Sequence, residues 1–241
     1  MQSRLLSTRV VGRAIHMASR PPRVWLQAST ATIYSHRYDG PNDERSGMFG
    51  GHESNAPEAW RFSIEVALAW ERAFYETPTP STRKVAMRSA LTLSPDAGGI
   101  FDVLVGLARR GLGGRAGDGH QYVSWIHHAD FVSIVRWLID RSDIDGAVNI
   151  AAPAPLTNAE FMRLLRKECG ALFGLPTPRW MLELGAAVLQ TETELVLKSR
   201  RVVPARLLEH GFRFAFPTWA AAARDLCERW NAMRAQRLAA A

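Results

Sequence analysis

The chain has 241 residues, of which 47% are hydrophobic and 22% are charged, a composition that excludes a disordered protein and allows one large domain or a domain with a small appendage. Its formal net charge of +7 invites a nucleic-acid interpretation, but the basic residues are spread along the chain without zinc-finger, RNP or basic-heptad spacing, so we expect no nucleic-acid partner. We also expect no membrane partner, because no apolar run reaches membrane-spanning length; even the run over residues 180–190 carries Glu183 and Gly185.

The N-terminal segment, residues 1–23, contains five arginines and no acidic residue. This composition is typical of a mitochondrial transit peptide, but an amphipathic helix explains it too. The apolar residues that can share one face of such a helix are Leu5, Val10, Val11 and Ile15. We favour the helix and place it over residues 4–18, before two prolines.

A short buried strand is predicted over residues 23–30, RVWLQAST, where an apolar run closes with small residues. It ends in Ser29 and Thr30 and leads into a polar, glycine-bearing loop. Open α/β sheets bind ligands at the carboxyl ends of their strands, so these hydroxyls are placed to bind a substrate carbonyl or hydroxyl. Alternatively, they only cap the strand and satisfy turn amides. The residues alone leave both interpretations open.

A helix is predicted over residues 60–75, where apolar side chains recur every fourth position. These side chains are Phe62, Val66, Trp70 and Phe74. The breaker run TPTPST follows, and residues 84–93 then predict a second buried strand. Residues 100–111 predict a helix that is stopped by glycine.

The glycine-rich segment at 111–119, GLGGRAGDG, has the composition of a phosphate-binding loop. Such a loop must follow a strand and open a helix, so that backbone amides face the phosphates. This segment follows a helix and precedes a strand predicted over residues 121–127. We therefore interpret it as a connecting loop.

Two adjacent histidines, His127 and His128, end that strand. Adjacent residues on a strand point to opposite faces, so the two imidazoles cannot easily bind one ion, and no third strong ligand is nearby. We expect no metal site, one packed or hydrogen-bonded histidine, and Asp130 as the cap of a helix over residues 131–140.

The remaining elements are a strand over residues 145–153 and a helix that runs through Arg166. Thr157 and Glu160 have the spacing of a capping box at the start of that helix. The last third is mainly helical, interrupted by strand-like patterns over residues 201–216. Strands that alternate with helices indicate an α/β class with a parallel sheet.

The two cysteines, Cys169 and Cys227, lie far apart inside helical segments. This spacing favours reduced thiols in a cytoplasmic protein over a disulfide scaffold. We therefore expect a cytoplasmic protein.

Several segments together carry a resemblance to a known family. In chain order they are ASTATIY, WRFSIEVALAWERA, VAMRSALTLSPDAGGIF, GLGG followed by GDGHQYVSWIHHADFV, DGAVNIAAPAPLTNAEFMRLL, and the tail TETELVLKSRRVVPARLLEHGFRFAFPTWAAAARDL. This order resembles the extended short-chain dehydrogenase/reductase superfamily. More narrowly, it is similar to NAD-dependent epimerase-like proteins that carry a conserved C-terminal domain of unknown function.

The resemblance implies a partial Rossmann-like parallel sheet with flanking helices plus a small, mainly helical C-terminal domain. Residues 1–152 would form the C-terminal part of the NAD(P)-binding epimerase domain. Residues 153–241 would hold mixed substrate-side segments and the epimerase-associated domain. The family's phosphate-binding glycine loop lies on its first strand, and this chain matches the family from the helix before the fifth strand. The part without a counterpart amounts to roughly 90 residues, at about 30 per βαβ unit.

The resemblance also implies site residues. Thr30 matches the hydroxyl that polarises the substrate, and Ser29 stands beside it. The superfamily's Tyr-x-x-x-Lys pair falls on Phe62 and Val66, which can neither exchange a proton nor lower a neighbour's pKa. Tyr34 matches a different position, without an acid/base role.

On the cofactor side, the resemblance places Ala28, Arg88 and Ser89 near the nicotinamide of NAD or NADP. Leu91 replaces the family's usual substrate-binding asparagine, and Val123 replaces its phosphate-binding arginine. Both departures argue against a nucleotide-sugar substrate, so the small-molecule substrate stays unknown.

From these observations we expect an NAD(P)-dependent epimerase or oxidoreductase-like protein that is impaired or inactive as this truncated chain. The alternative is a non-catalytic binding or remnant protein of the same fold. Without a strand beside it, the strand over residues 23–30 would present an unpaired apolar edge, through which we expect self-association.

Overall fold

The computed structural model describes residues 2–53, 57–177 and 198–240. Its main sheet has three parallel strands in the order β1-β2-β6, formed by β1 (Val24–Thr30), β2 (Arg83–Ser89) and β6 (Gly146–Ile150). In the register, Thr30 is paired with Ser89, and Ser89 with Ile150, so the three carboxyl ends meet at one edge. The expected α/β class with a parallel sheet is confirmed.

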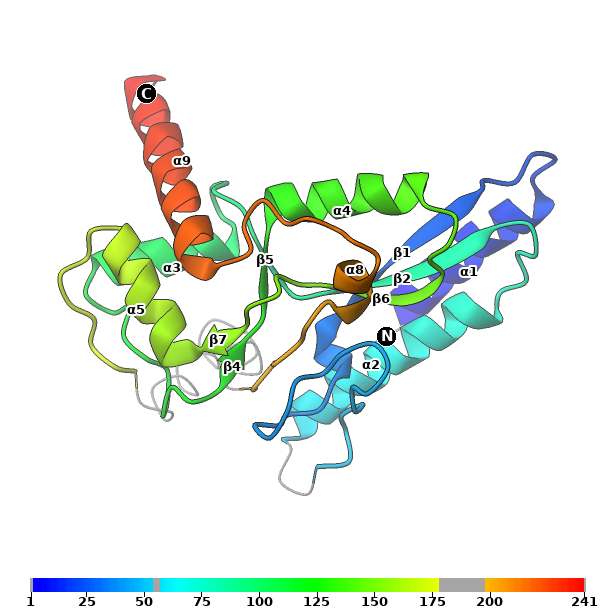
Figure 1. The fold of residues 1–241 in the computed structure, drawn as a ribbon, viewed down its shortest axis with the longest axis horizontal. Helices are drawn as coiled ribbons and strands as arrows, with labels where there is room; N and C mark the ends of the chain where they lie inside the picture. The colour runs from blue at the N-terminus through cyan, green and yellow to red at the C-terminus, as the bar shows by residue number, and fades with distance from the viewer. Residues whose placement is uncertain (1, 54–56, 178–197, 241) are drawn as a thin grey trace.

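Helices cover both faces of this sheet (Figure 1). One face carries α1 (Gln2–Met17) and α2 (Glu58–Glu76), and the opposite face carries α4 (His128–Asp140) and the short α8 (Ala205–Glu209). The helices expected near residues 4–18 and 60–75 are thus confirmed as α1 and α2.

The strict alternation of strand side chains decides what each face buries. On the α2 side, Trp25 of β1 and Ala86 of β2 pack against Phe74. On the α4 side, Val85 and Met87 of β2 join a cluster with Ile134 and Leu138 of α4. Successive residues of a strand point to opposite faces, so each strand supplies both layers of the core.

Two smaller sheets extend the main one. Strand β3 (Leu91–Leu93) pairs in parallel with β5 (Trp125–His127), and β4 (Tyr122–Val123) pairs antiparallel with β7 (Leu156–Thr157). The sequence predicted one strand where β2 and β3 lie, and this prediction is wrong. The chain changes partner at Ala90, because the Ala90 amide donates to β6 whereas the Leu91 amide donates to Ser124.

In the other half of the molecule, the described residues form the helices α3 (Ile100–Arg109), α5 (Asn158–Glu168) and α9 (Trp219–Ala240). They enclose a second core in which the indole of Trp219 stacks on Phe161 at a centroid distance of 4.1 Å. The capping prediction for α5 is confirmed, since the Thr157 hydroxyl accepts a hydrogen bond from the Glu160 amide.

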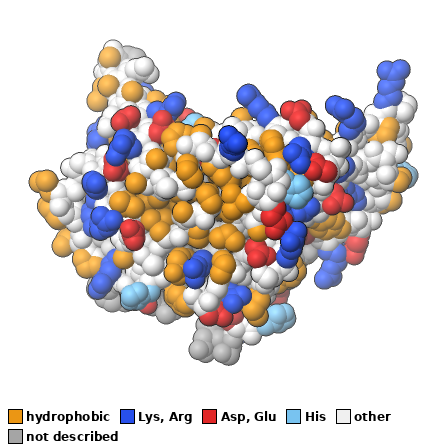
Figure 2. Space-filling model, viewed as in Figure 1, with side chains coloured by type: hydrophobic (Ala, Val, Ile, Leu, Met, Phe, Trp, Pro, Cys, Tyr) orange, Lys and Arg blue, Asp and Glu red, His pale blue; other side chains and the backbone are white. Residues whose placement is uncertain are grey.

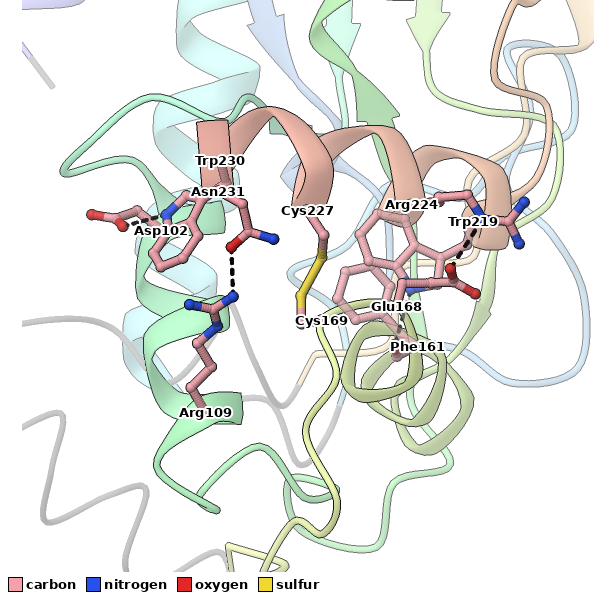
Figure 3. Close-up of a disulfide and its surroundings, with 10 residues drawn as sticks. All are labelled: Asp102, Arg109, Phe161, Glu168, Cys169, Trp219, Arg224, Cys227, Trp230 and Asn231. Carbon is pink, nitrogen blue, oxygen red and sulfur yellow. Dashed lines mark hydrogen bonds and ion pairs between the residues drawn. A yellow bond between two sulfur atoms is a disulfide. The ribbon is translucent and has the colours of Figure 1, made fainter. Parts of the chain in front are cut away.

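The cysteine prediction is wrong. Cys169, just after α5, and Cys227, in α9, form a disulfide with their Cα atoms 5.6 Å apart (Figure 3). Residues far apart in the sequence meet here because α9 packs along α5, which sequence spacing could not show.

Two further local predictions are wrong. The cap of α4 is His127, whose Nδ1 accepts from the Ala129 amide, and not Asp130. The Asp130 carboxylate instead accepts hydrogen bonds from the amides of Ala215 and Phe216. The strand-like segment 212–216 is an extended connection and forms no strand, and the preceding segment contains the helix α8.

Among the described residues, no helix is long and apolar enough to cross a membrane. The apolar run 180–190 lies outside the described residues. On the face viewed in Figure 2, basic and acidic side chains are interspersed around a central area in which hydrophobic side chains gather. This distribution shows no continuous basic surface on that face.

Candidate functional site

A cavity of about 190 Å³ lies at the carboxyl ends of β1 and β2, and we call it the strand-end cavity. Thr30 and Ser89 both line it, and they are paired in the register of the two strands. The full lining is Thr30, Ala31, Thr32, Ser89, Ala90, Leu91, Thr92, Tyr122, Val123, Ser124, Lys198 and Arg200. The structure therefore brings together two of the residues that the sequence singled out.

Ser29 and Arg88 face the other side of the sheet. Their neighbours Thr30 and Ser89 point toward the cavity, so alternation sends Ser29 and Arg88 toward α2. There the Ser29 hydroxyl donates to Glu71 at 2.5 Å, and Arg88 donates through Nε and Nη2 to both carboxylate oxygens of Glu71, at 2.9 and 2.8 Å. Both side chains therefore bond to Glu71 on the side of the sheet away from the cavity, and neither is part of the cavity lining.

The buried network continues from Arg88 to Tyr34 and Asn149. Arg88 Nη1 donates to the Tyr34 hydroxyl at 2.9 Å, and that hydroxyl donates to Asn149 Oδ1 at 2.8 Å. Burial raises the pKa of Tyr34, although Arg88 opposes this effect. Burial alone would lower the pKa of Arg88, but its hydrogen bonds to Glu71 raise it above its ordinary value. Tyr34 is 1% exposed and is not among the residues that line the cavity.

The segment 198–203 completes the cavity from the opposite side. Lys198 Nζ donates to the Thr32 carbonyl at 2.8 Å, directly after β1. The Ser124 hydroxyl donates to the Arg200 carbonyl at 2.5 Å and accepts from the Val202 amide at 2.7 Å. These bonds hold Lys198 and Arg200 at the wall, two residues that sequence reasoning did not assign to the site. The only signal for them is the basic run KSRR at 198–201.

The lining of the strand-end cavity has a distinct chemistry. Six of its residues carry a hydroxyl group, two carry a positive charge, and none carries a carboxylate. Hydroxyls donate to substrate oxygens, and guanidinium and ammonium groups attract anions. The arrangement suits a polar ligand with an anionic group.

The residues at the expected acid/base positions lie on α2. The side chain of Phe62 is 52% exposed, and that of Val66 is buried. Neither lines the strand-end cavity, and neither side chain can hold a proton to exchange. Ala28 is exposed on β1 and also lies outside the cavity lining.

The other candidate motifs hold loops and helices in place. In the glycine-rich loop, Gly117 and Gly119 have φ of +60° and +75°, a backbone conformation that favours glycine. The Ala116 amide of that loop donates to the side chain of Asn158 at the start of α5.

The adjacent histidines do not form a metal site with other described residues. His127 is fully buried, and its Nε2 lies 3.1 Å from Asp225 of α9. The described residues contain no cluster of three or more His, Cys, Asp or Glu that could hold a metal ion.

Comparison with known proteins identifies the family of this chain. A family model described as a domain of unknown function (DUF1731) matches residues 177–226. The bovine epimerase family protein SDR39U1 is 33% identical over 227 residues, which span 94% of this chain and 73% of that protein. The chain belongs to this epimerase family. The resemblance to the extended short-chain dehydrogenase/reductase superfamily is thereby confirmed.

Solved structures support the same family. The crystal structure of human epimerase family protein SDR39U1 with NADPH matches with a TM-score of 0.82 and 30% identity, covering 94% of this chain and 72% of that one. A nucleoside-diphosphate sugar epimerase from Corynebacterium glutamicum matches with a TM-score of 0.72 and 27% identity, over 94% of this chain and 42% of that one. The strand-end cavity therefore lies in a chain whose fold matches that of epimerase-family proteins.

Proposed function

We propose that this protein is an NAD(P)-dependent epimerase or oxidoreductase-like protein whose substrate is a small molecule with a hydroxyl or keto group and an anionic group. The observation that carries the proposal is the pairing of Thr30 and Ser89 in a cavity whose charged residues are Lys198 and Arg200. In this arrangement the Thr30 hydroxyl polarises the reacting oxygen of the substrate, and the two cations bind its anionic group.

The residues present fit the nicotinamide side of NAD(P). They offer small side chains and hydroxyls at the carboxyl ends of parallel strands, where open α/β sheets bind ligands. When bound, NAD(P) supplies hydride acceptance and return. None of the residues that line the cavity belongs to a glycine-rich loop that follows a strand and opens a helix, the kind of segment that would hold the pyrophosphate. Together with Phe62 and Val66 at the expected acid/base positions, this lining favours impaired catalysis by this chain.

A second candidate is a non-catalytic binding protein of the same fold. Phe62 and Val66 favour it, because the positions expected to hold the acid/base pair carry no ionisable group. Among the lining residues of the cavity, Tyr122, Lys198 and Arg200 are the ionisable ones, and none is a carboxylate or an imidazole.

Titration of the purified chain with NADPH and NADH, followed by cofactor fluorescence, separates the two candidates. Micromolar binding supports the NAD(P)-linked function. Absence of binding, in a chain that melts cooperatively, supports the non-catalytic candidate.

The role of Thr30 is tested by Thr30→Val and Thr30→Ser in assays of NADP reduction with a panel of sugar phosphates and hydroxy acids. We expect Thr30→Val to lower the residual turnover of the chain about 100-fold, the typical effect of removing one positioned donor. The hydroxyl also accepts from the Thr32 amide at 3.2 Å, a bond that Thr30→Ser retains. Equal activity of the two variants would contradict the assigned role.

A further inference from the structure

A second cavity, of about 450 Å³, lies between α3 and α9, and we call it the α3–α9 cavity. Trp230, Arg234 and Arg237 of α9 are spaced by four and three residues, so they share one helix face. The opposing wall is formed by residues of α3 and by Arg110, which directly follows this helix. The lining is Asp102, Val103, Gly106, Leu107, Arg110, Trp230, Arg234 and Arg237, none of which lines the strand-end cavity.

Asp102 fixes the indole of Trp230 in this cavity (Figure 3). Trp230 Nε1 donates to Asp102 Oδ1 at 2.6 Å, and the Gly98 amide donates to Oδ2 at 2.9 Å. These hydrogen bonds, with the positive charges of Arg237 and Arg234, lower the pKa of Asp102. The only carboxylate of the lining is therefore charged and already holds two donors.

The positive charge of the three arginines in the cavity lining exceeds the single negative charge of Asp102. No ion pair found within the described part of the chain involves Arg110, Arg234 or Arg237. Three guanidinium groups and one carboxylate leave a net charge of two positive units in the lining. A phosphate monoester carries about −1.5 to −2 near neutral pH, which matches this excess.

The remaining surface of the cavity is apolar and aromatic. The guanidinium carbons of Arg109 and Arg234 lie 4.5 and 5.2 Å from the Trp230 ring centre, in cation–π geometry. Arg109 is held further by its hydrogen bond to Asn231 (Figure 3). Val103 is 51% exposed, so the cavity offers apolar contact beside its donors.

We propose that the α3–α9 cavity binds an organic phosphate, with the phosphate held by Arg110, Arg234 and Arg237 and the apolar body lying against Val103 and Leu107. Arginine forks match the oxygens of phosphate and form charge-assisted hydrogen bonds to them. The volume lies in the range of small-molecule sites. This site is separate from the one proposed for the substrate, and it stands whether or not that function is correct.

Equilibrium dialysis with 4-methylumbelliferyl phosphate tests the proposal. The probe carries an aromatic body and a phosphate, and 4-methylumbelliferone and inorganic phosphate supply each part alone. We expect the phosphorylated probe to bind more tightly than either part. Arg234→Gln and Arg110→Gln, on different elements, should each weaken binding about 10-fold, the effect of one lost charge-assisted hydrogen bond.

The matched control is Arg13→Gln on α1, which changes the net charge equally at an exposed arginine remote from the cavity. We expect this variant to bind the probe like the unmodified chain. Equal weakening in the control would show unspecific attraction of anions and overturn the proposal. Unchanged binding in both cavity variants, or equally tight binding of 4-methylumbelliferone, would overturn it as well. Unchanged melting temperatures confirm that the variants are folded.

Discussion

At the scale of single residues, the pair formed by Glu71 and Arg88 is the main electrostatic feature beneath the candidate site. Both side chains are more than nine-tenths buried, and two parallel hydrogen bonds join them. Removing one partner leaves the other charge in the interior without compensation, which typically costs about 3–5 kcal/mol. We expect Arg88→Leu to lower the free energy of unfolding by about this amount in urea titrations.

The exposed pair Arg141–Asp143 provides the control. Its side chains are 34% and 50% exposed, and solvent screens such pairs strongly. We expect Arg141→Leu to change the free energy of unfolding by about 0–1 kcal/mol. A similar loss in both variants would refute the structural role given to Arg88.

A second residue-scale expectation concerns pH and His127. Burial, followed by the nearby His128, holds the pKa of His127 below its ordinary value of 6.5, although Asp225 acts in the opposite direction. The unfolded chain therefore binds a proton at this residue at a higher pH than the folded protein does. The free energy of unfolding should fall as the pH is lowered below about 6.5.

The contribution of His127 is measured by comparing unfolding at about pH 7 and pH 5 in the unmodified chain and in His127→Gln. We expect a smaller pH dependence in the variant. His36, whose pKa burial also lowers, acts in the same direction and accounts for part of the slope that remains. The exposed His120→Gln serves as the control and should retain the full slope. A slope unchanged in His127→Gln would contradict the expectation.

The residues of the strand-end cavity show what sequence reasoning could and could not find. Thr30 and Ser89 end apolar strands, a local pattern that predicts their position at the sheet edge. The same pattern does not say which residue of the pair Ser29 and Thr30 faces the cavity, because that depends on which face of the sheet packs against α2. Lys198 and Arg200 reach the cavity only through long-range hydrogen bonds, and no local pattern records those.

At the scale of elements, the long helices with a clear apolar period and the buried strands β1 and β6 were predictable, whereas the break between β2 and β3 was not. The pattern at 60–75 predicts α2 because one face of the helix is buried against the sheet. Residues 84–93 contain no glycine or proline that would mark a break, yet they form two strands because the chain exchanges one hydrogen-bonding neighbour for another at Ala90. Such an exchange depends on the position of β5, which is distant in sequence.

The disulfide between Cys169 and Cys227 is the main covalent link between elements. It closes a loop with a sequence separation of 58 residues and joins the end of α5 to α9 (Figure 3). Chain-entropy arguments give about 4 kcal/mol for closing a loop of this length in the unfolded state. We expect Cys227→Ser to lower the free energy of unfolding by up to about this amount under oxidising conditions.

Thermal and urea unfolding with and without dithiothreitol measure this effect. The unmodified chain should lose stability when the reductant is added. A variant with both Cys169→Ser and Cys227→Ser is the control, because it has no disulfide to reduce. An unmodified chain with the same stability in both conditions would show that the disulfide contributes nothing.

At the scale of the whole molecule, the sheet order β1-β2-β6 places β1 at an edge. The Arg23 carbonyl accepts from Arg83, so the alternate residues Val24, Leu26 and Ala28 direct their amides away from β2. The side chain of Gln27 donates to the Ala28 carbonyl at 3.1 Å, which satisfies one group of this edge locally. Family membership could be predicted from the joint order of the segments. Whether the β1 edge pairs with another strand in solution could not be predicted, because that depends on which other chains can bind to it.

An open strand edge with unpaired amides is a template for pairing with another chain. We therefore expect the 241-residue chain to self-associate through β1, with a mass that rises with concentration in light scattering coupled to size exclusion. Ala28→Pro should reduce this association, because proline removes an amide that faces the open edge and leaves the bonds to β2 intact. Ala28→Ser, which keeps the amide, should associate like the unmodified chain. A concentration-independent monomer for the unmodified chain would show that the β1 edge does not pair in solution.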